Sequence, residues 1–293
     1  MSFKTQLEAK KFVVTAEVGP LKGTDTTELV EVAELLKGKV DAANATDQQS
    51  SVMRLGSLVT CHLMQDHGVE AVLQMTCRDR NRMALQSDLL SAWALGIHNV
   101  LCITGDLPAL GDHPQAKPVY DLDSVQLLWV INHKLNQGQD LSGAELKGKP
   151  DFFSGAVVTP GANTEASLEM QIIKMEKKIE AGAKFFQTQA VYDPASFEKF
   201  MKRVEKFGIP VLAGIIPLKS AGMAKFMNKN VSGVFVPDAL IARMNDAKDK
   251  VQTGIEITAN LIKELKGMCQ GVHIMAIGWE KKVPAILDAA GLK

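Results

Sequence analysis

The chain has 293 residues, of which 46% are hydrophobic and 5% aromatic, so it can bury one large and mainly aliphatic core. Lysine and arginine together number 33, as do aspartate and glutamate, so no net charge would attract nucleic acid or an anionic membrane. Residues 1–19 contain no apolar run of signal-peptide length, and no later stretch is apolar for long enough to span a bilayer, which favours a cytoplasmic protein.

The four cysteines are widely separated, at Cys61, Cys77, Cys102 and Cys269. They form no C-x-x-C pair, and no histidine stands at a zinc-ligand interval from them. We therefore expect buried, reduced thiols and no metal ion in this chain. The sequence also contains no His-Glu-x-x-His or P-loop pattern, so neither a metal nor a nucleoside triphosphate is indicated as the source of its chemistry.

Short runs rich in Val, Ile and Phe alternate with longer helical patterns along the whole chain, which is typical of repeated β-α units around a parallel sheet. Eight such runs predict strands, the number that a closed barrel needs. They cover residues 12–17, 40–45, 71–75, 99–103, 152–158, 184–188, 210–216 and 272–277.

Segments between these runs carry apolar residues three and four apart, with charges on the opposite face, and predict helices at 27–36, 82–95, 165–181 and 195–207. The polar, Gly- and Lys-containing segment 136–150 predicts a surface loop, and the region after Pro237 is long enough for more than one helix. A doubly wound open sheet is the alternative, but no glycine-rich dinucleotide fingerprint follows the first run. We therefore predict a (β/α)8 TIM barrel that forms one domain over residues 1–293.

Polar residues follow the apolar runs where a barrel would place its active site, at the carboxyl ends of the strands. Side-chain amides at such positions can bind the edge of a heterocycle through paired donors and acceptors. The sequence therefore predicts an enzyme with an acid and an amide-lined pocket. The residues are Glu17, Asn44, Thr46, Gln74, Thr76, Thr104, Gly105, Asp106, Thr159, Gln187, Thr188 and Gln189.

Two of these residues are candidate catalytic acids. Glu17 follows an apolar run and precedes Val18-Gly19-Pro20, so it would lie at the rim of an apolar core, where loss of solvent favours the protonated carboxyl. Such a group is a competent general acid, although a glutamate here could instead cap a turn or pair with a lysine. Asp106 stands in the run ITGDLP, where it is either a catalytic group after a barrel strand or a turn-former.

Lys177 and Lys178 belong to the charged run KMEKKIE of the predicted helix 165–181. A solvated, ion-paired helix face is the ordinary interpretation of such a run. Phosphate binding is the alternative.

Three segments carry a resemblance to a known family. They are TAEVGP at 15–20, TCRDRNRMALQSDLLSAWALGIHNVLCITGDLP at 76–108 and EKKIEAGAKFFQTQAVYD at 176–193. Together they closely resemble the methylenetetrahydrofolate reductase family, and the likeness extends over nearly the whole chain with its motifs in order.

The resemblance implies an oxidoreductase of one-carbon metabolism that acts on a CH–NH bond and reversibly reduces 5,10-methylenetetrahydrofolate to 5-methyltetrahydrofolate, as used in methionine biosynthesis or the acetyl-CoA pathway. It implies that Glu17 protonates the folate N10 as the methylene bridge opens to an iminium ion, which then receives a hydride from flavin N5. It also implies that Asp106 lies near the flavin and the pterin, where its charge stabilises the developing cation, and that Gln189 contacts the folate.

The same resemblance implies a flavin, FAD or alternatively FMN, across the carboxyl end of the barrel. The positions that correspond to flavin contacts are Thr46, Thr76, Thr104, Gly105, Asp106, Tyr120, Thr159, Asn163, Lys177 and Lys178.

Several positions depart from the pattern of the family members that use NAD(P)H. Thr104 and Trp279 stand in place of arginines, Gln74 and Asn163 in place of histidines, and Ala221 in place of an aromatic residue. The electron donor is therefore either NAD(P)H or a partner subunit that carries metal or iron–sulfur centres, because four scattered cysteines cannot hold such a cluster here. An oligomer or a heteromeric complex is expected.

Two other functions remain open from the residues. One is a flavin-free folate or corrinoid methyltransferase barrel, which would share a pterin-sized pocket. The other is a barrel subunit of a redox complex that has lost its chemistry, although Glu17, Asp106 and Gln189 are all present.

Overall fold

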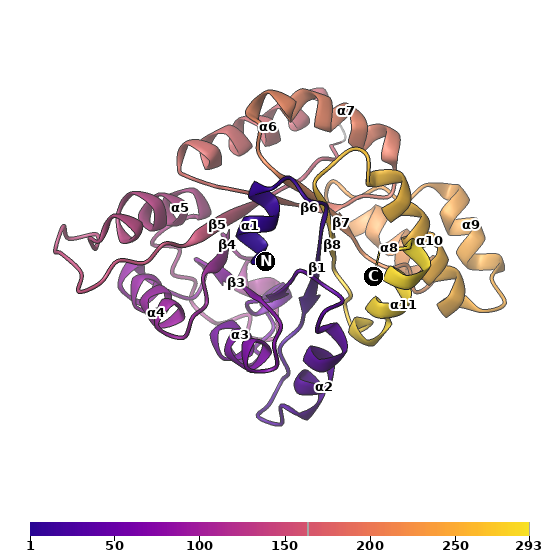
Figure 1. Cartoon of the computed structure of the whole chain (residues 1–293). Coiled ribbons are helices and arrows are strands. Elements are labelled where there is room, and N and C mark those ends of the chain that lie inside the picture. Colours follow the sequence, from indigo (N-terminus) through magenta and orange to yellow (C-terminus); the bar gives the residue numbers. More distant parts are fainter. Residues whose placement is uncertain (163, 293) are drawn as a thin grey trace.

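The strands form a closed barrel in which all neighbours are parallel and β8 returns to pair with β1 (Figure 1). This computed structural model describes residues 1–162 and 164–292. The strands are β1 (Val13–Val18), β2 (Ala42–Ala45), β3 (Ala71–Thr76), β4 (Asn99–Ile103), β5 (Phe153–Val158), β6 (Phe186–Ala190), β7 (Val211–Ile215) and β8 (Gly271–Ile274). The arrangement confirms the predicted (β/α)8 TIM barrel and excludes the doubly wound sheet.

Helices surround the barrel as an outer ring (Figure 1). Short polar side chains fix where several of them begin: Asn81 accepts hydrogen bonds from the first turn of α4, and Asp123 and Gln126 form a capping box on α5. The helices are α1 (Phe3–Glu8), α2 (Thr27–Leu36), α3 (Ser57–Asp66), α4 (Arg82–Ala94), α5 (Ser124–His133), α6 (Glu165–Glu180), α7 (Pro194–Val204), α8 (Ala221–Asn230), α9 (Asp238–Asp246), α10 (Lys250–Leu265) and α11 (Val283–Ala290).

The buried apolar residues form two clusters, as the two-residue period of a strand requires. The larger cluster lies between the outer faces of the strands and the helices and includes Val14, Ala16 and Ile274. The smaller cluster fills the interior of the barrel toward the N-terminal ends of its strands. It consists of Phe3, Leu7, Val13, Ala42, Val72, Leu101, Phe153, Phe185 and Leu212.

The N-terminal helix α1, which the sequence analysis did not predict, closes one end of the barrel. The Phe3 ring is fully buried and meets Phe153 and Phe185 edge to face, with ring centroids 6.0 and 5.2 Å apart. The backbone N–H of Phe3 donates to Glu70 Oε2 at 2.8 Å, which ties α1 to the residue before β3. Only the C-terminal end of the barrel is therefore left to receive a ligand from outside.

All eight predicted strands are present, and their ends differ from the predictions by at most three residues. The last strand was predicted to reach residue 277 but ends at Ile274. A turn follows it, in which the Trp279 N–H donates to Ala276 O and Ile277 takes a left-handed backbone angle of 47°. The sixth strand lies two residues later than predicted, at Phe186–Ala190, and contains an irregular register against β7.

The structure also contains the predicted loop and the predicted helices after Pro237. Residues 136–150 form a loop whose only pairing among the described residues is an isolated bridge between Gln139 and Glu145. The α-helices α9 and α10 lie between Pro237 and the last strand, β8. All four cysteines are free thiols, three of them buried, and burial raises the pKa of Cys77 to about 12. Within residues 1–162 and 164–292, no helix has both the length and the apolar character that crossing a membrane requires.

Candidate functional site

A polar layer lies above the apolar interior of the barrel, toward the C-terminal ends of the strands. Asn44 on β2 and Gln187 on β6 exchange two amide hydrogen bonds, of 2.8 and 3.1 Å, across the barrel. Gln187 Nε2 also donates to Thr15 Oγ1 on β1 at 3.3 Å. These side chains are at most 1% exposed, so their mutual bonds satisfy groups that water does not reach. This hydrogen-bonded layer therefore forms the bottom of the open, C-terminal end of the barrel.

Glu17 lies at the edge of this layer, at the C-terminal end of β1. Its side chain is 11% exposed; its Oε1 accepts a hydrogen bond from Gln74 Nε2 at 2.9 Å and lies 3.5 Å from His273 Nε2 on β8. No described residue donates to Oε2. In the described part of the chain Glu17 thus neither caps a turn nor pairs with a lysine, and one of its two oxygens is available to a ligand.

A cavity of about 310 Å³ opens beside Gln74 at the ends of β3, β4 and β5. Gln74 is one of the residues that line it, and the Nε2 of the same side chain donates the hydrogen bond to Glu17 Oε1. Five of the predicted flavin positions line the same cavity, although they come from three separate parts of the sequence. They are Thr76, Thr104, Gly105, Asp106 and Lys178.

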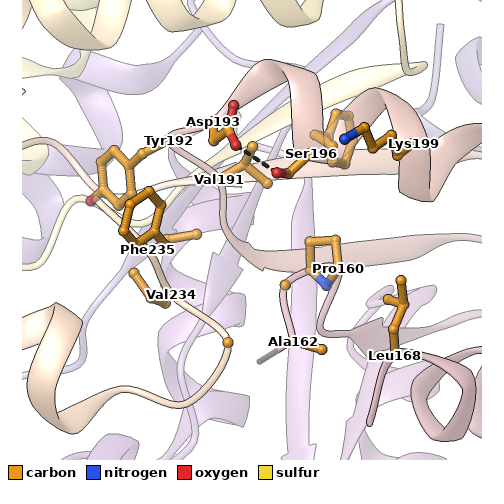
Figure 2. A pocket seen from close by; sticks show the side chains of 14 residues that line it. Pro160, Ala162, Leu168, Val191, Tyr192, Asp193, Ser196, Lys199, Val234 and Phe235 are labelled. Atoms are coloured by element: carbon orange, nitrogen blue, oxygen red, sulfur yellow. Dashed lines mark hydrogen bonds between the residues drawn. The ribbon is translucent and has the colours of Figure 1, made fainter. Parts of the chain in front are cut away.

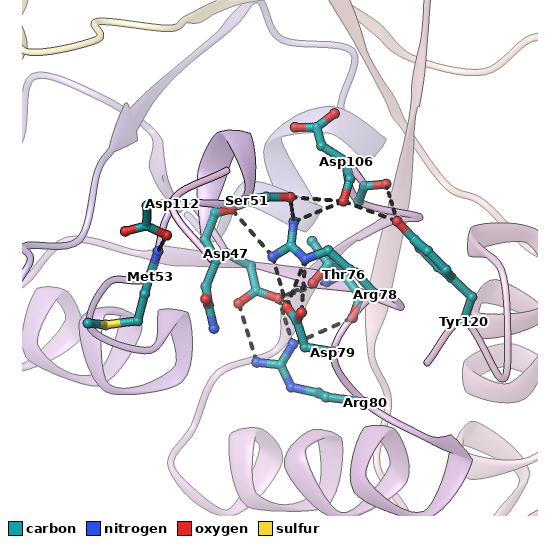
Figure 3. A network of polar contacts seen from close by, with 12 residues as sticks. Asp47, Ser51, Met53, Thr76, Arg78, Asp79, Arg80, Asp106, Asp112 and Tyr120 are labelled. Atoms are coloured by element: carbon teal, nitrogen blue, oxygen red, sulfur yellow. Dashed lines mark hydrogen bonds and ion pairs between the residues drawn. The ribbon is translucent and has the colours of Figure 1, made fainter. Parts of the chain in front are cut away.

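The backbone around Asp106 is held by side chains from three other segments, as Figure 3 shows. Its carbonyl oxygen accepts hydrogen bonds from Ser51 Oγ at 2.9 Å, Tyr120 Oη at 3.0 Å and Arg78 Nη1 at 3.4 Å. Its carboxylate, by contrast, receives no hydrogen bond from a described residue and is exposed to solvent. Asp106 is therefore not a turn-former through its side chain: the loop is fixed by its backbone, and the charge is left free.

A buried ionic cluster supports the same wall of the cavity (Figure 3). Asp47 Oδ2 accepts hydrogen bonds from the backbone N–H and the hydroxyl of Thr76, both at 2.8 Å, and from Arg80 Nη1 at 2.7 Å. Arg80 also pairs with Asp88 on α4 at 2.8 Å. Because the carboxylate is fully buried and each of its contacts is a donor, the cluster locks the end of β3 to the loop after β2.

The two candidate phosphate-binding lysines have different environments. Lys178 reaches inward from α6, lines the cavity, and donates to Val157 O at 2.7 Å. Burial, helped by the nearby positive charge of Lys174, lowers the pKa of Lys178 to about 8. Lys177 is exposed and does not line the cavity. A solvated helix face therefore describes Lys177 but not Lys178.

The other predicted flavin and folate positions do not line this cavity in the described structure. Thr46 follows β2 and is 1% exposed, and its hydroxyl has no hydrogen-bond partner in the described structure. Tyr120 acts through its bond to Asp106 O, and Thr159 is half-buried directly after β5. Gln189 lies in the irregular part of β6, where its Oε1 accepts from the Ala190 N–H at 2.9 Å. Asn163 is outside the described residues.

A second cavity, of about 420 Å³, is lined in part by Pro160, Gly161 and Ala162 of the β5–α6 loop (Figure 2). Tyr192, Asp193 and Ser196 line it at the start of α7, and Val234 and Phe235 line it from the loop after α8. None of the described residues that the sequence analysis singled out lines this cavity. Ala190, the neighbour of Gln189 on β6, is among its lining residues.

Several functional-site residues were missed by the sequence analysis. His273 and Thr15 are inward-facing neighbours of Glu17, and they could have been found by extending the two-residue alternation of β1 and β8. Arg78, Asp47 and Ser51 stand in loops, where no periodic signal identifies which side chains turn inward. Within the described residues, no three His, Cys, Asp or Glu side chains are grouped closely enough to hold a metal ion.

Two positions that depart from the NAD(P)H-using pattern have structural partners outside the cavity. Trp279 packs its ring against α10 at Gly254, where a Cβ atom would lie only 3.1 Å from the indole. The Nζ of Lys219 lies 5.9 Å from the centroid of the same ring. Ala221 is the half-buried first residue of α8.

The family profile described as "Methylenetetrahydrofolate reductase" matches residues 2–291. Methylenetetrahydrofolate reductase 2 of Schizosaccharomyces pombe is 28% identical over 252 residues, which is 78% of this chain and 37% of that protein. The 5,10-methylenetetrahydrofolate reductase of Pectobacterium carotovorum is 28% identical over 206 residues, covering 68% of this chain and 61% of that protein.

Among solved structures, a protein from Clostridium thermocellum, described as binding two copies of 5-methyl-5,6,7,8-tetrahydrofolic acid, has the same fold, with a TM-score of 0.62 at 14% identity. The match covers 99% of this chain and 98% of that one. The curated relatives are longer than this chain, which matches roughly a third to three-fifths of their length. The profile match over almost all residues nevertheless shows that the chain belongs to the methylenetetrahydrofolate reductase family.

Proposed function

We propose that residues 1–293 form one catalytic domain that binds a flavin and interconverts 5,10-methylenetetrahydrofolate and 5-methyltetrahydrofolate. The observation that carries the proposal is the placement of Glu17. This acid lies at the open end of the barrel with Oε2 unbonded by any described residue, and Gln74 connects it directly to a cavity lined by five predicted flavin positions. Family membership makes reduction of methylenetetrahydrofolate the activity that this arrangement supports best.

The residues around the cavity fit a flavin chemically. The hydroxyl of Thr46 is buried and has no hydrogen-bond partner among the described residues, which is costly unless a ligand atom completes its hydrogen bonding. Lys178 offers a cation to a phosphate group. Gly105 has a left-handed φ of 94°, and its backbone lines the cavity. A Cβ atom at this residue would lie only 3.0 Å from Arg78 Cβ, so glycine allows the close approach. These three features support FAD or FMN at the C-terminal end of the barrel.

The chain's own residues supply the acid and the charge that the reaction needs. Glu17 donates a proton from Oε2 to N10 of the folate, which opens the methylene bridge to an iminium cation on N5. The free carboxylate of Asp106 stabilises the positive charge as it develops, because its backbone is fixed in advance by three hydrogen bonds. A bound flavin supplies the hydride that converts the iminium carbon to a methyl group. Gln189, on β6, is proposed to contact the folate.

The electron donor is proposed to be NAD(P)H or a partner subunit with metal or iron–sulfur centres, in an oligomeric or heteromeric assembly. The site has no aromatic side chain at Ala221, the position where the resemblance places a stacking residue for substrate or nicotinamide. Steady-state assays with NADH, with and without proteins that co-purify with the chain, distinguish the two donors. Activity with NADH and the purified chain alone would exclude the need for a partner.

Glu17→Gln tests the proposed acid. The amide keeps the size of the side chain but has no proton to donate, so we expect the variant to retain its flavin and to reduce methylenetetrahydrofolate about 10²- to 10⁴-fold more slowly. The same exchange at Glu198, which is exposed and pairs with Lys202 on the outside of α7, is the matched control. Rate constants for oxidation of pre-reduced flavin by the folate provide the measurement. An unchanged rate in Glu17→Gln would assign the acid to another group.

The same assay separates the proposal from its two alternatives. A flavin-free methyltransferase barrel would purify without a visible flavin band and would not recover one on reconstitution. A barrel subunit without catalytic activity would bind flavin or folate. The activity of the redox complex that contains it would then be the same with Glu17→Gln as with the wild-type subunit.

A further inference from the structure

The geometry around Glu17 points to a further role: we propose that His273, together with Gln74, holds Oε1 of Glu17 so that the acid proton is carried and delivered by Oε2. His273 is then a positioning residue for the proposed reduction of methylenetetrahydrofolate, and the inference rests on that proposed function. It assigns a task to a histidine that is 3% exposed and buried in the middle of the barrel.

Both contacts to Glu17 meet the same oxygen. Gln74 Nε2 donates to Oε1 at 2.9 Å from β3, and His273 Nε2 lies 3.5 Å from Oε1 on β8. Oε2 receives neither contact. A carboxylic acid whose one oxygen accepts from two N–H groups carries its proton on the other oxygen, because the oxygen that accepts cannot also hold a proton directed at those donors. The two contacts therefore fix the place of the Glu17 carboxyl group and also determine which of its oxygens carries the proton.

The orientation of His273 is fixed by the polar layer beneath it. Its Nδ1 lies 2.9 Å from Thr15 Oγ1. That oxygen accepts a hydrogen bond from Gln187 Nε2, and Nδ1 is a nearer acceptor for the Thr15 hydroxyl than Val272 O, which lies 3.4 Å away. Thr15 therefore donates to Nδ1, which leaves the imidazole proton on Nε2, the nitrogen that faces Glu17.

Among the described residues, no other charged side chain belongs to this hydrogen-bond network. Glu17 and His273 are its ionisable members, and Thr15, Asn44, Gln74 and Gln187 are neutral. The contact of 3.5 Å is long for a hydrogen bond, as is common in catalytic sites before a substrate closes them.

Two substitutions at His273 test the role of Nε2. Glutamine can place an amide N–H where Nε2 stands, whereas asparagine reaches only the position of Nδ1. With flavin reduced anaerobically and methylenetetrahydrofolate at saturation, we expect His273→Asn to slow flavin oxidation by about 10- to 100-fold, the effect of losing a hydrogen bond to a charged or acidic group. His273→Gln should restore most of the wild-type rate.

Three readouts separate positioning from a general structural effect. The flavin content, the Kd for the folate and the rate of flavin oxidation by a quinone acceptor should all stay at wild-type values in both variants, because none of them requires a proton from Glu17. Thr15→Val removes the hydroxyl that fixes the tautomer while nearly keeping side-chain volume, and it should slow the folate-dependent step selectively. This variant decides the question if neither substitution at His273 yields folded protein.

The inference is overturned if His273→Asn and Thr15→Val react with the folate at the wild-type rate, or if His273→Gln is as slow as His273→Asn. Failure of the underlying function is distinguishable, since in that case the wild-type protein itself would not transfer electrons from reduced flavin to the folate.

Discussion

Lys178 is a residue of the proposed site whose buried charge lowers the free energy of unfolding. Its ammonium group is held in the cavity wall by Val157 O, and burial lowers its pKa to about 8 from the ordinary 10.5. Between these two values the unfolded chain binds more protons than the folded one, so the free energy of unfolding rises with pH across this window. Below about pH 8 the folded protein bears the full cost of the buried charge. In the proposed function, this cost is offset when Lys178 binds a phosphate group of the flavin.

Lys178→Met should therefore change stability and binding in opposite directions. At pH 7 we expect the free energy of unfolding of the flavin-free protein to increase by about 1–3 kcal/mol, and this gain to vanish as the pH rises past 10.5. Flavin affinity should fall about tenfold, because a charge-assisted contact to phosphate is lost. Denaturant titrations at several pH values and fluorescence titrations with flavin measure the two effects.

Lys177→Met provides the comparison, because Lys177 is the neighbouring residue but is exposed on α6. The structure predicts that it changes both quantities much less than Lys178→Met does. An equal loss of flavin affinity in the two variants would show that the buried position of Lys178 is not what binds the cofactor.

At the scale of elements, two loops make the cavity wall by packing backbone against backbone. The loop after β2 contains three consecutive or nearly consecutive residues with left-handed backbone angles, Gln48, Ser50 and Ser51. Such angles are uncommon for residues other than glycine and persist only where surrounding contacts impose them. Here the Ser51 hydroxyl donates a hydrogen bond to Asp106 O and accepts one from Arg78 Nη1 at 3.0 Å. This loop and the loop after β4 therefore stabilise each other.

Gly111 is the residue that lets these loops meet. Its φ of −102° suits any residue, but a Cβ atom there would lie 1.9 Å from Ser51 O. Gly111→Ala should therefore separate the loops, lower the free energy of unfolding by about 1–3 kcal/mol and weaken flavin binding, because the Asp106 backbone loses its support. Thermal unfolding and flavin titration measure both effects.

The control for this element is Gly267→Ala, where no atom would lie within 4 Å of the added methyl group. It should leave flavin binding unchanged. If Gly111→Ala behaved like Gly267→Ala, the close approach of the two loops would not matter for the site.

At the scale of the whole molecule, the barrel separates stability from function along its axis. Its N-terminal end is filled by an aromatic cluster under α1, and its C-terminal end carries the polar layer, Glu17 and the cavity. This division is general for TIM barrels, in which the loops at the C-terminal face hold the active site. Changes at the closed end should therefore alter stability without altering chemistry.

Phe3→Ala tests this separation. Removing a fully buried ring that contacts Phe153 and Phe185 should cost about 3–5 kcal/mol of unfolding free energy through lost burial and the cavity left behind. Below its unfolding temperature the variant should bind flavin normally. Phe226→Ala, at an exposed position of α8, is the control and should have little effect on stability. A large loss of flavin affinity in Phe3→Ala would contradict the separation.

The sequence was sufficient to predict the barrel and all eight strands, which depend on hydrophobic periodicity, and six of the thirteen residues that line the cavity, most of them polar residues at strand ends. It was insufficient where tertiary contacts decide. Lys177 and Lys178 are adjacent lysines in one charged run, so the sequence does not distinguish them. The rotation of α6 about its axis directs Lys178 into the cavity and Lys177 to the surface. The short helix α1 has too few residues for a periodic signal, and the support of Asp106 by Ser51, Arg78 and Tyr120 joins loops far apart in the chain.

The central claim is that this chain passes a hydride between a flavin and a folate-bound one-carbon unit. It is tested most directly by reducing the flavin of the wild-type protein without oxygen, adding 5,10-methylenetetrahydrofolate, following the visible flavin band and identifying the folate product. We predict that the oxidised flavin band returns rapidly and that an equal amount of 5-methyltetrahydrofolate forms. A folded protein that takes up no flavin, or whose reduced flavin is not oxidised by the folate, would contradict the claim.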